Sequence, residues 1–272
     1  MLFKDINCPN CHTYHDPTLS KCPNCHKDNE LFKLNRVPKR VAFLHPIAQV
    51  ALFIIGFAYV GMLIAELFFL IVLQVETGTG DVYKNVLLNL LTYLAMFAGL
   101  ISVILFTRRS YFFSKFTNGV DYLYGLAYAI TVIALCTVLN ILLSFIGPAQ
   151  DNANQSAAVI MINNYPLLTF FMIGFLGPVC EELTYRVGLY SFLRRINKWA
   201  ALAITTVVFA LIHFDFQATD IVVELWSLPT YLLSGAILTY AYEHRGPACS
   251  ISAHMTYNIF AFLMIIVQNH GQ

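Results

Sequence analysis

Two adjacent glutamates, Glu181 and Glu182, lie within an apolar stretch, and Arg186 follows four residues after the second. Side chains at i and i+4 meet on one face of a helix, so this spacing predicts an ion pair between Glu182 and Arg186. Glu181 points about 100° away around the same helix and is expected to remain unpaired. Carboxylates at membrane depth are costly unless they face a polar cavity or a partner. The pattern therefore indicates one structural carboxylate beside one that is free for catalysis.

Two further polar pairs follow later in the chain. Phe209 and His213 are four residues apart, and so are His254 and Asn258, which places each pair on one helix face. Three helices could then bring these residues and the glutamates to one interior cavity. A carboxylate with a histidine can activate water, and a second histidine with an amide can stabilise developing negative charge. The alternative is a cluster that only holds helices together.

A third constellation lies near the N-terminus. Cys8, Cys11, Cys22 and Cys25 form the sequence Cys-Pro-Asn-Cys twice, ten residues apart. This spacing is typical of a short zinc ribbon, in which four thiolates hold one structural Zn²⁺. A segment this small has no core of its own, so the metal would have to fold it. Two disulfides are the alternative.

The other histidines and cysteines near these motifs are expected to have no chemical role. A tetrathiolate site leaves no ligand position for His12, His15 and His26, which are predicted to be solvated. Cysteines within apolar sequence are most often small buried core residues. That prediction applies to Cys136, Cys180 and Cys249.

The composition sets the fold class. The chain has 272 residues, of which 58% are hydrophobic and 11% charged, and its mean hydropathy is +0.66. Soluble domains carry about 25% charged residues, so an all-α, polytopic transmembrane helix bundle is predicted. The net charge of +1 without a basic stripe gives no indication of nucleic-acid binding. The first 30 residues are polar, so no signal peptide is expected.

Seven apolar runs are long enough, or nearly so, to cross a membrane with some tilt. They cover about residues 47–73, 86–106, 122–146, 165–193, 199–214, 228–242 and 248–267. A turn near Gly80 and a polar loop at 150–155 separate some of them. Gly177 and Pro178 are expected to bend the fourth and to free backbone groups near the glutamates. The predicted organisation is a zinc-ribbon-like module at 1–30, a basic linker at 31–45 and a transmembrane domain at 46–272.

Charged residues alternate between the two sides of this predicted bundle. One side holds Lys33, Arg36, Lys39, Arg40, Arg108, Arg109, Lys115, Arg194, Arg195, Lys198 and Arg245. The other holds Glu76, Asp81, Asp151, Asp215, Asp220 and Glu224, with Lys84 against the trend. By the positive-inside rule the N-terminus lies in the cytosol and the C-terminus outside. The ribbon then lies in a reducing compartment, where zinc thiolates survive and disulfides do not.

The three polar motifs together resemble the CPBP membrane proteases, also called the CAAX-protease and bacteriocin-processing or Abi family. The family pattern is Glu-Glu-x-x-x-Arg, Phe-x-x-x-His and His-x-x-x-Asn. Residues 181–186, 209–213 and 254–258 match it without departure. The resemblance covers about residues 170–262. The ribbon lies outside it and is an addition found on some bacterial membrane proteins, which favours the bacterial plasma membrane.

The resemblance implies an intramembrane endopeptidase. Glu181 would be the general base, and His213 would help it hold a water. His254 and Asn258 would stabilise the oxyanion of the tetrahedral intermediate. Glu182 and Arg186 would support the site.

The choice between a metallo- and a glutamate-type mechanism stays open from the sequence. Glu181, His213 and His254 could form a His₂Glu zinc site. Such a site also needs carboxylates behind its histidines, and Glu182 is expected to be engaged with Arg186. We therefore favour catalysis by a Glu–His-activated water, with zinc confined to the four N-terminal cysteines.

Other functions remain as alternatives. One is a non-catalytic scaffold, sensor or bacteriocin self-immunity protein of the same fold. Another is a transporter with a carboxylate proton relay, although no repeated half-motif is visible. For a peptidase, the expected partners are the lipid bilayer and a membrane-associated peptide or protein. A bacterial chain favours a bacteriocin leader or signalling peptide over a prenylated CAAX protein.

Overall fold

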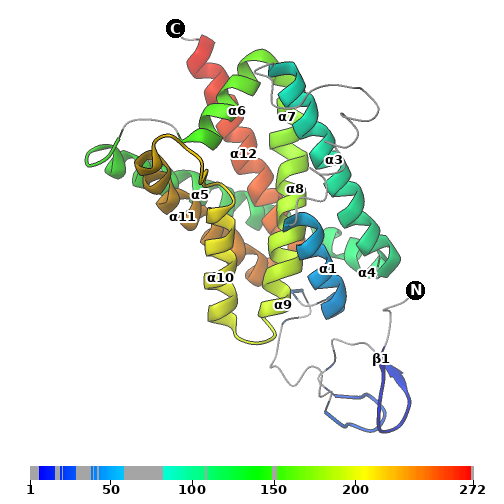
Figure 1. The fold of residues 1–272 in the computed structure, drawn as a ribbon. Helices are drawn as coiled ribbons and strands as arrows, with labels where there is room; N and C mark the ends of the chain where they lie inside the picture. The colour runs from blue at the N-terminus through cyan, green and yellow to red at the C-terminus, as the bar shows by residue number, and fades with distance from the viewer. Residues whose placement is uncertain are drawn as a thin grey trace.

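Helices make up most of the described chain (Figure 1). The computed structural model describes residues 6–15, 19, 21–28, 38, 40, 41, 43–57, 82–107, 109–148 and 152–270. The elements are β1 (Ile6–Asn7), β2 (Tyr14–His15), α1 (Pro46–Phe57), α3 (Val82–Thr107), α4 (Arg109–Phe113), η3 (Ser114–Phe116), α5 (Gly119–Ser144), α6 (Ala153–Asn164), α7 (Pro166–Phe171), η4 (Met172–Leu176), α8 (Gly177–Glu181), η5 (Glu182–Tyr190), α9 (Ser191–Leu193), α10 (Lys198–Leu211), α11 (Ile221–Arg245) and α12 (Pro247–His270).

Five helices within the described residues are long and apolar enough to cross a membrane. They are α3, α5, the stretch Pro166–Leu193, α11 and most of α12. The apolar helix α10 has 14 residues, which at about 1.5 Å per residue is shorter than a hydrocarbon layer of about 30 Å. Helix α1 covers 12 residues within the described part of the chain. The first expected span lies outside the described residues beyond position 57, as does the turn near Gly80. The all-α transmembrane bundle is confirmed, whereas the expected total of seven spans is not.

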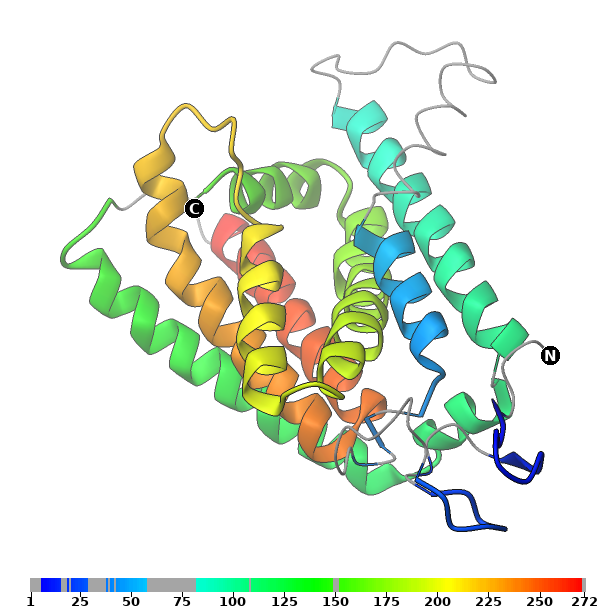
Figure 2. The same cartoon turned by 60° about the horizontal axis from the view of Figure 1, so that its bottom comes forward.

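The stretch Pro166–Leu193 is the centre of the bundle and combines several helix types. Its segments η4 and η5 are π-helical, with the α-helical turn α8 between them. π-helical turns are rare in proteins and occur frequently at functional sites. All nine residues of η5 are buried, because α1, α10, α11 and α12 all pack against it (Figure 2). The glutamate motif therefore lies at the junction of α8 and η5, inside the bundle.

A proline in this stretch leaves one backbone carbonyl without its helical partner. The N–H of Gly177 donates to the carbonyl of Met172, five residues back. The next bond of that type would need an N–H at Pro178, which proline lacks. The carbonyl of Ile173 is thus available to a donor from outside the helix, in agreement with the expectation for Gly177 and Pro178.

Close backbone contact fixes α1 against η5. A Cβ added at Gly188 would lie 2.9 Å from the backbone N of Phe53 and 3.0 Å from the carbonyl O of Gln49. Backbone atoms cannot move aside as a flexible side chain can, so only glycine fits there. Small residues at helix contacts are a common means of tight packing in membranes. This contact holds the short helix α1 beside the glutamate motif.

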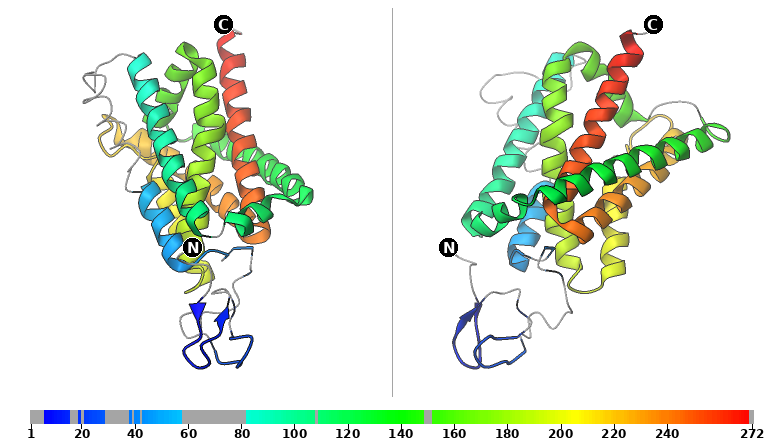
Figure 3. Two further views of the ribbon diagram at one scale, coloured as in Figure 1. Left: turned by 90° about the vertical axis from the view of Figure 1, so that its right-hand side faces the viewer. Right: turned by 180° about the vertical axis from the view of Figure 1, so that it is seen from behind.

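The bundle has two chemically different ends (Figures 1 and 3). We call the end where α9 finishes and α12 begins the basic end, because α4, η3 and the α9–α10 connection place Arg109, Lys115, Arg194 and Lys198 there. We call the opposite end, where α3 and α7 begin and α12 finishes, the α6 end. The start of α1 and the finish of α12 lie at opposite ends.

Two expectations at the α6 end were wrong. The expected loop at 150–155 gives way to α6, which begins at Ala153 with the Asn152 side chain accepting from Gln155 N at 3.0 Å. Glu224, expected with Asp215 and Asp220 in an acidic connection between two spans, lies in the first turn of α11 and is 1% exposed. Its carboxylate accepts from Ala153 N at 2.8 Å and from Asp215 N at 3.1 Å. A carboxylate at a helix N-terminus is favourable, so Glu224 fastens α6 to the bundle.

Candidate functional site

Glu182 and Arg186 form the predicted ion pair. Arg186 Nη1 lies 2.9 Å from Glu182 Oε1, and both side chains are 0% exposed. Arg186 Nη2 also donates to the carbonyl of Gly235 at 3.3 Å. Its guanidinium carbon lies 4.3 Å from the centre of the Phe209 ring, within the range of a cation–π contact. The pair thus ties η5 to α10 and α11.

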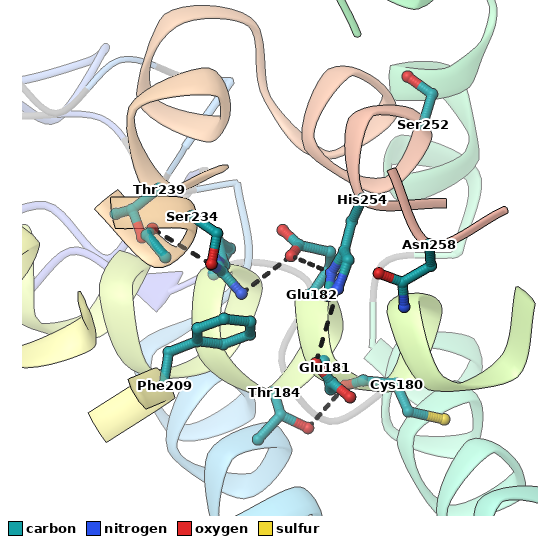
Figure 4. A network of polar contacts seen from close by, with 12 residues as sticks. Cys180, Glu181, Glu182, Thr184, Phe209, Ser234, Thr239, Ser252, His254 and Asn258 are labelled. Atoms are coloured by element: carbon teal, nitrogen blue, oxygen red, sulfur yellow. Dashed lines mark hydrogen bonds and ion pairs between the residues drawn. The ribbon is translucent and has the colours of Figure 1, made fainter. Parts of the chain in front are cut away.

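His254 lies between the two glutamates (Figure 4). Its Nδ1 is 3.0 Å from Glu182 Oε1, and its Nε2 is 3.8 Å from Glu181 Oε2. A carboxylate paired with an arginine only accepts hydrogen bonds, so Nδ1 carries a hydrogen, and Nε2 on the other side of the ring faces Glu181. Glu182 thus engages Arg186 as expected and, beyond that expectation, also contacts His254. Glu182 is the carboxylate behind His254, the arrangement that orients histidines in many enzyme sites.

Glu181 differs from its neighbour in position and in partners. Its side chain is 13% exposed, and its Oε2 is buried without a hydrogen-bond partner among the described residues. It lines a cavity of about 860 Å³. A buried carboxylate oxygen without a donor is costly, so this atom is available to a ligand in the cavity.

His213 lies just past the end of α10 rather than within it. Its Nδ1 is 2.8 Å from the carbonyl O of Phe209. A carbonyl only accepts, so Nδ1 carries the hydrogen and Nε2 keeps its lone pair. His213 and Phe209 both line the cavity with Glu181. The arrangement makes His213 an acceptor for a water or other donor beside Glu181.

Tyr231 of α11 holds the His213 ring in place. The two rings are nearly parallel, with centres 4.5 Å apart and an angle of 20°. The Tyr231 hydroxyl accepts from Asn154 Nδ2 at 3.1 Å and Asn152 Nδ2 at 3.4 Å. Tyr231 was not predicted as a site residue, because no motif distinguishes it among the 15 tyrosines of the sequence. Through it, the start of α6 is connected to the site.

Asn258 is positioned by the backbone defect described above. Its Nδ2 donates to the carbonyl of Ile173 at 3.0 Å, the group that Pro178 leaves without a helical partner. The side chain lies beside His254 on α12 (Figure 4). One amide hydrogen is therefore used to orient the side chain, and the second remains for another acceptor.

The structure brings all three motifs together, as expected. Glu181, Phe209, His213, His254 and Asn258 line one cavity, and Glu182 and Arg186 are buried behind it. In the part of the chain that the structure describes, the three residues considered for catalytic zinc do not form a group with ligand atoms within 4.8 Å of one another. As arranged, Glu181, His213 and His254 do not offer the compact ligand set of a His₂Glu zinc site.

The four N-terminal cysteines do form a candidate metal centre. Their sulfurs all lie within 4.8 Å of one another, with Cys8–Cys25 at 3.6 Å and Cys11–Cys22 at 3.5 Å. A disulfide would need about 2.05 Å, whereas a tetrahedral Zn²⁺ with Zn–S bonds of about 2.3 Å places sulfurs nearly 4 Å apart. The thiol donor set therefore fits one structural Zn²⁺, which would supply folding energy to the segment.

The two knuckles repeat the same backbone geometry. His12 N donates to Cys8 O and His26 N donates to Cys22 O, each at 2.9 Å. Both histidines have a φ of 57°, in the left-handed region, where histidine is several-fold enriched. The two knuckles thus have the same backbone conformation and together surround the four sulfurs.

The histidine predictions were right for two of three residues in the ribbon. His12 and His26 are exposed, but His15 is 6% exposed and belongs to β2, which pairs with β1. A strand pair of this size can cover one side chain, which the spacing of cysteines does not reveal. The thiols of Cys136, Cys180 and Cys249 are buried as predicted.

A hydrogen bond tunes one ribbon thiol. Cys11 Sγ lies 3.4 Å from the Thr13 hydroxyl, whose oxygen accepts from Asn24 Nδ2. This contact lowers the pKa of the Cys11 thiol to about 5. A lowered pKa favours the thiolate, which is the form that binds a metal.

The five long apolar helices define an integral membrane protein, and its polar site is buried between them. Residues 163–260 match the model of the Rce1-like family, type II CAAX prenyl endopeptidases. This region contains all three motifs. This match supports the CPBP family of membrane proteases and, at the level of the family, a protease.

Three curated relatives share part of the chain. UPF0177 protein YvdC of Lactococcus lactis is 32% identical over 119 residues, 43% of this chain and 41% of that protein. UPF0177 protein YxdF of Lactococcus lactis is 30% identical over 128 residues, 46% of this chain and 65% of that protein. The membrane-embedded CAAX protease MroQ of Staphylococcus aureus is 26% identical over 146 residues, 51% of this chain and 55% of that protein. The match thus spans less than two thirds of each relative, and no solved structure matches.

Proposed function

We propose that the chain is an intramembrane endopeptidase in which Glu181 activates a water for attack on a peptide carbonyl. One observation carries the proposal. Glu181 presents to the cavity a carboxylate oxygen that has no hydrogen-bond donor among the described residues, while Glu182 is held by Arg186 and His254. Two neighbouring carboxylates with such different environments can take different roles. The protease family of the matched region supports this reading.

The reaction follows from the donors and acceptors around the cavity. A water between Glu181 and His213 Nε2 gives a proton to Glu181, and its oxygen adds to the peptide carbonyl carbon. The carbonyl oxygen gains the negative charge, which a protonated His254 and the second N–H of Asn258 stabilise. Collapse of this intermediate breaks the C–N bond, and Glu181 returns the proton to the leaving amine. Glu182 stabilises the charged form of His254 throughout.

Zinc has a structural role in this proposal. The ion is assigned to Cys8, Cys11, Cys22 and Cys25, and the reaction proceeds by the Glu–His pair. Exhaustive chelation of the Cys22→Ser variant, which lacks the ribbon site, tests this assignment. Activity that survives chelation supports it, whereas activity lost on chelation and restored by zinc would place a catalytic ion at the glutamates.

The proposed setting is the bacterial plasma membrane with the N-terminus in the cytosol. The distribution of lysine and arginine supports this orientation, and the relatives reported above come from bacteria. The proposed substrate is a membrane-associated peptide or protein, because MroQ bears the name of a CAAX protease.

The experiment compares membrane peptides from cells that carry wild type, Glu181→Gln or Asp220→Asn. Loss of a general base lowers the rate by about 100- to 10,000-fold, so cleavage products should disappear with Glu181→Gln. Asp220→Asn is the matched control, because Asp220 is an exposed N-cap and asparagine caps as well. Identical peptides from wild type and Glu181→Gln would instead favour a non-catalytic scaffold, sensor or immunity protein.

A further inference from the structure

The cavity that holds Glu181 extends well beyond the reacting groups, and side-chain amides line that extension. Asn85 and Asn89 come from α3, Asn140 from α5, and Asn154 and Gln155 from α6. Among the described residues of this lining, Glu181 has the only carboxylate, and lysine and arginine are absent. Several polar side chains at membrane depth are expensive to keep without a use. The extension is therefore polar without being charged.

These amides offer both kinds of hydrogen-bonding group. Asn89 Nδ2 donates to the Asn85 carbonyl O within α3 at 2.8 Å, which leaves the Asn89 side-chain oxygen as an acceptor. The Asn140 oxygen accepts from Thr230, which leaves its NH₂ group as a donor. Alternating donors and acceptors are what the backbone of an extended peptide requires.

The extension lies at the α6 end of the bundle. Its lining comes from the first half of α3, the last half of α5, α6, the start of α11 and the last half of α12. The cations of α4, η3 and the α9–α10 connection lie at the opposite, basic end (Figure 3). Because lysine and arginine concentrate on the cytosolic side, the cavity extends toward the outer face.

We propose that this extension is a binding site for an uncharged, extended peptide segment that enters from the outer face of the membrane, through the α6 end. Uncharged side chains of the peptide suit a lining without countercharges. The side-chain amides of the lining would form hydrogen bonds with the main chain of the peptide. A volume of about 860 Å³ is within the range of pockets that enclose most of a ligand. The inference rests on the proposed function for the bond that is cut, but binding and entry need no catalysis.

The first arm of the test measures the side of entry. The Asn154→Cys substitution is introduced into the Glu181→Gln protein. Right-side-out and inverted membrane vesicles that contain this protein are then treated with a membrane-impermeant maleimide. Asn154 is an exposed residue of α6, so its cysteine should react in right-side-out vesicles only. Ser114→Cys, exposed at the basic end, is the control and should react in inverted vesicles only. Mass spectrometry reads each site apart from the native cysteines.

The second arm tests whether the cavity prefers an uncharged peptide to a charged one. An acetylated, amidated decapeptide of Ala, Leu and Gln is added before the maleimide, and its lysine-substituted counterpart serves as the matched probe. The uncharged peptide should slow labelling of Asn154→Cys at least tenfold relative to the lysine peptide. Reaction of Asn154→Cys from the basic side, or equal protection by the two peptides, overturns the inference. Neither result bears on whether Glu181 is catalytic, which the cleavage comparison decides separately.

Discussion

The ribbon and the cavity are both built from polar side chains. They differ in how far apart in the sequence the contacting residues lie. The contact between Cys8 and Cys25 joins residues 17 positions apart. The contact between His254 and Glu182 joins residues 72 positions apart. The ribbon is thus specified by one short segment and a metal, whereas the cavity requires η5, α10, α11 and α12 to be packed first. We expect changes in one region to leave the other intact.

Loss of a ribbon ligand should give the largest effect. Binding of structural Zn²⁺ is worth about 10–16 kcal/mol in small zinc modules, so Cys22→Ser should unfold the ribbon. The expected result is loss of one zinc per chain and fast hydrogen exchange in residues 6–28, with unchanged exchange in α12. Cys249→Ser, a buried cysteine in α12, is the matched control and should keep its zinc. Rapid exchange throughout the bundle in Cys22→Ser would show that the two regions are not independent.

Removal of the buried cation should give the largest effect within the bundle. Arg186→Leu leaves Glu182 as a buried charge without its ion-pair partner, at about 3–5 kcal/mol of unfolding free energy. Glu181→Gln should leave stability near wild type, because Glu181 Oε2 has no hydrogen bond to lose. Thermal unfolding in detergent measures both. Equal melting temperatures for the two variants would contradict the assignment of structural and catalytic carboxylates.

Loss of the ring that stacks on His213 should affect rate rather than binding. A small misplacement of a reacting group can lower a rate by about 100-fold, so Tyr231→Leu should lower kcat by about 10- to 100-fold with little change in KM. Tyr231→Phe keeps the ring and should retain most of the activity. The comparison is made with a substrate found by the cleavage experiment. If the Phe variant is as slow as the Leu variant, the hydroxyl rather than the stacking is responsible.

A change in the backbone of the first knuckle should give the smallest effect. His12 adopts a left-handed conformation, which costs an L-residue with a β-carbon about 1–2 kcal/mol. His12→Gly should therefore keep zinc affinity within about tenfold of wild type, and His12→Val should weaken it. Competition with a chelator measures both affinities. Stronger zinc loss in the glycine variant would mean that the imidazole itself supports the site.

Sequence spacing predicted what depends on neighbours within a few residues. The grouping of the thiols in both knuckles and the Glu182–Arg186 pair follow from fixed local separations. The meeting of the three motifs was expected as well, but it depends on the packing of helices far apart in the chain. The contacts of Tyr231, Glu224 and Asn258 do not follow from local separations, because each depends on a helix far away in the chain. The burial of His15 depends on the pairing of two two-residue strands, which the sequence does not predict. The short length of α10 could not be inferred from an apolar run that continues past the helix end.

The ion pair within η5 also bears on how the chain enters the membrane. A charged residue at the centre of an inserting helix costs about 2.5–3.5 kcal/mol, and the stretch Pro166–Leu193 has the lowest mean hydropathy of the five long helices, 1.4. Glu182 and Arg186 are partners on the same helix, so they can neutralise each other before α11 and α12 have been synthesised. Only Glu181 then enters the bilayer without a countercharge. Glu181, the residue proposed for catalysis, thus has no ion-pair partner on its own helix during insertion. His254 comes beside it only after α12 has been inserted and packed.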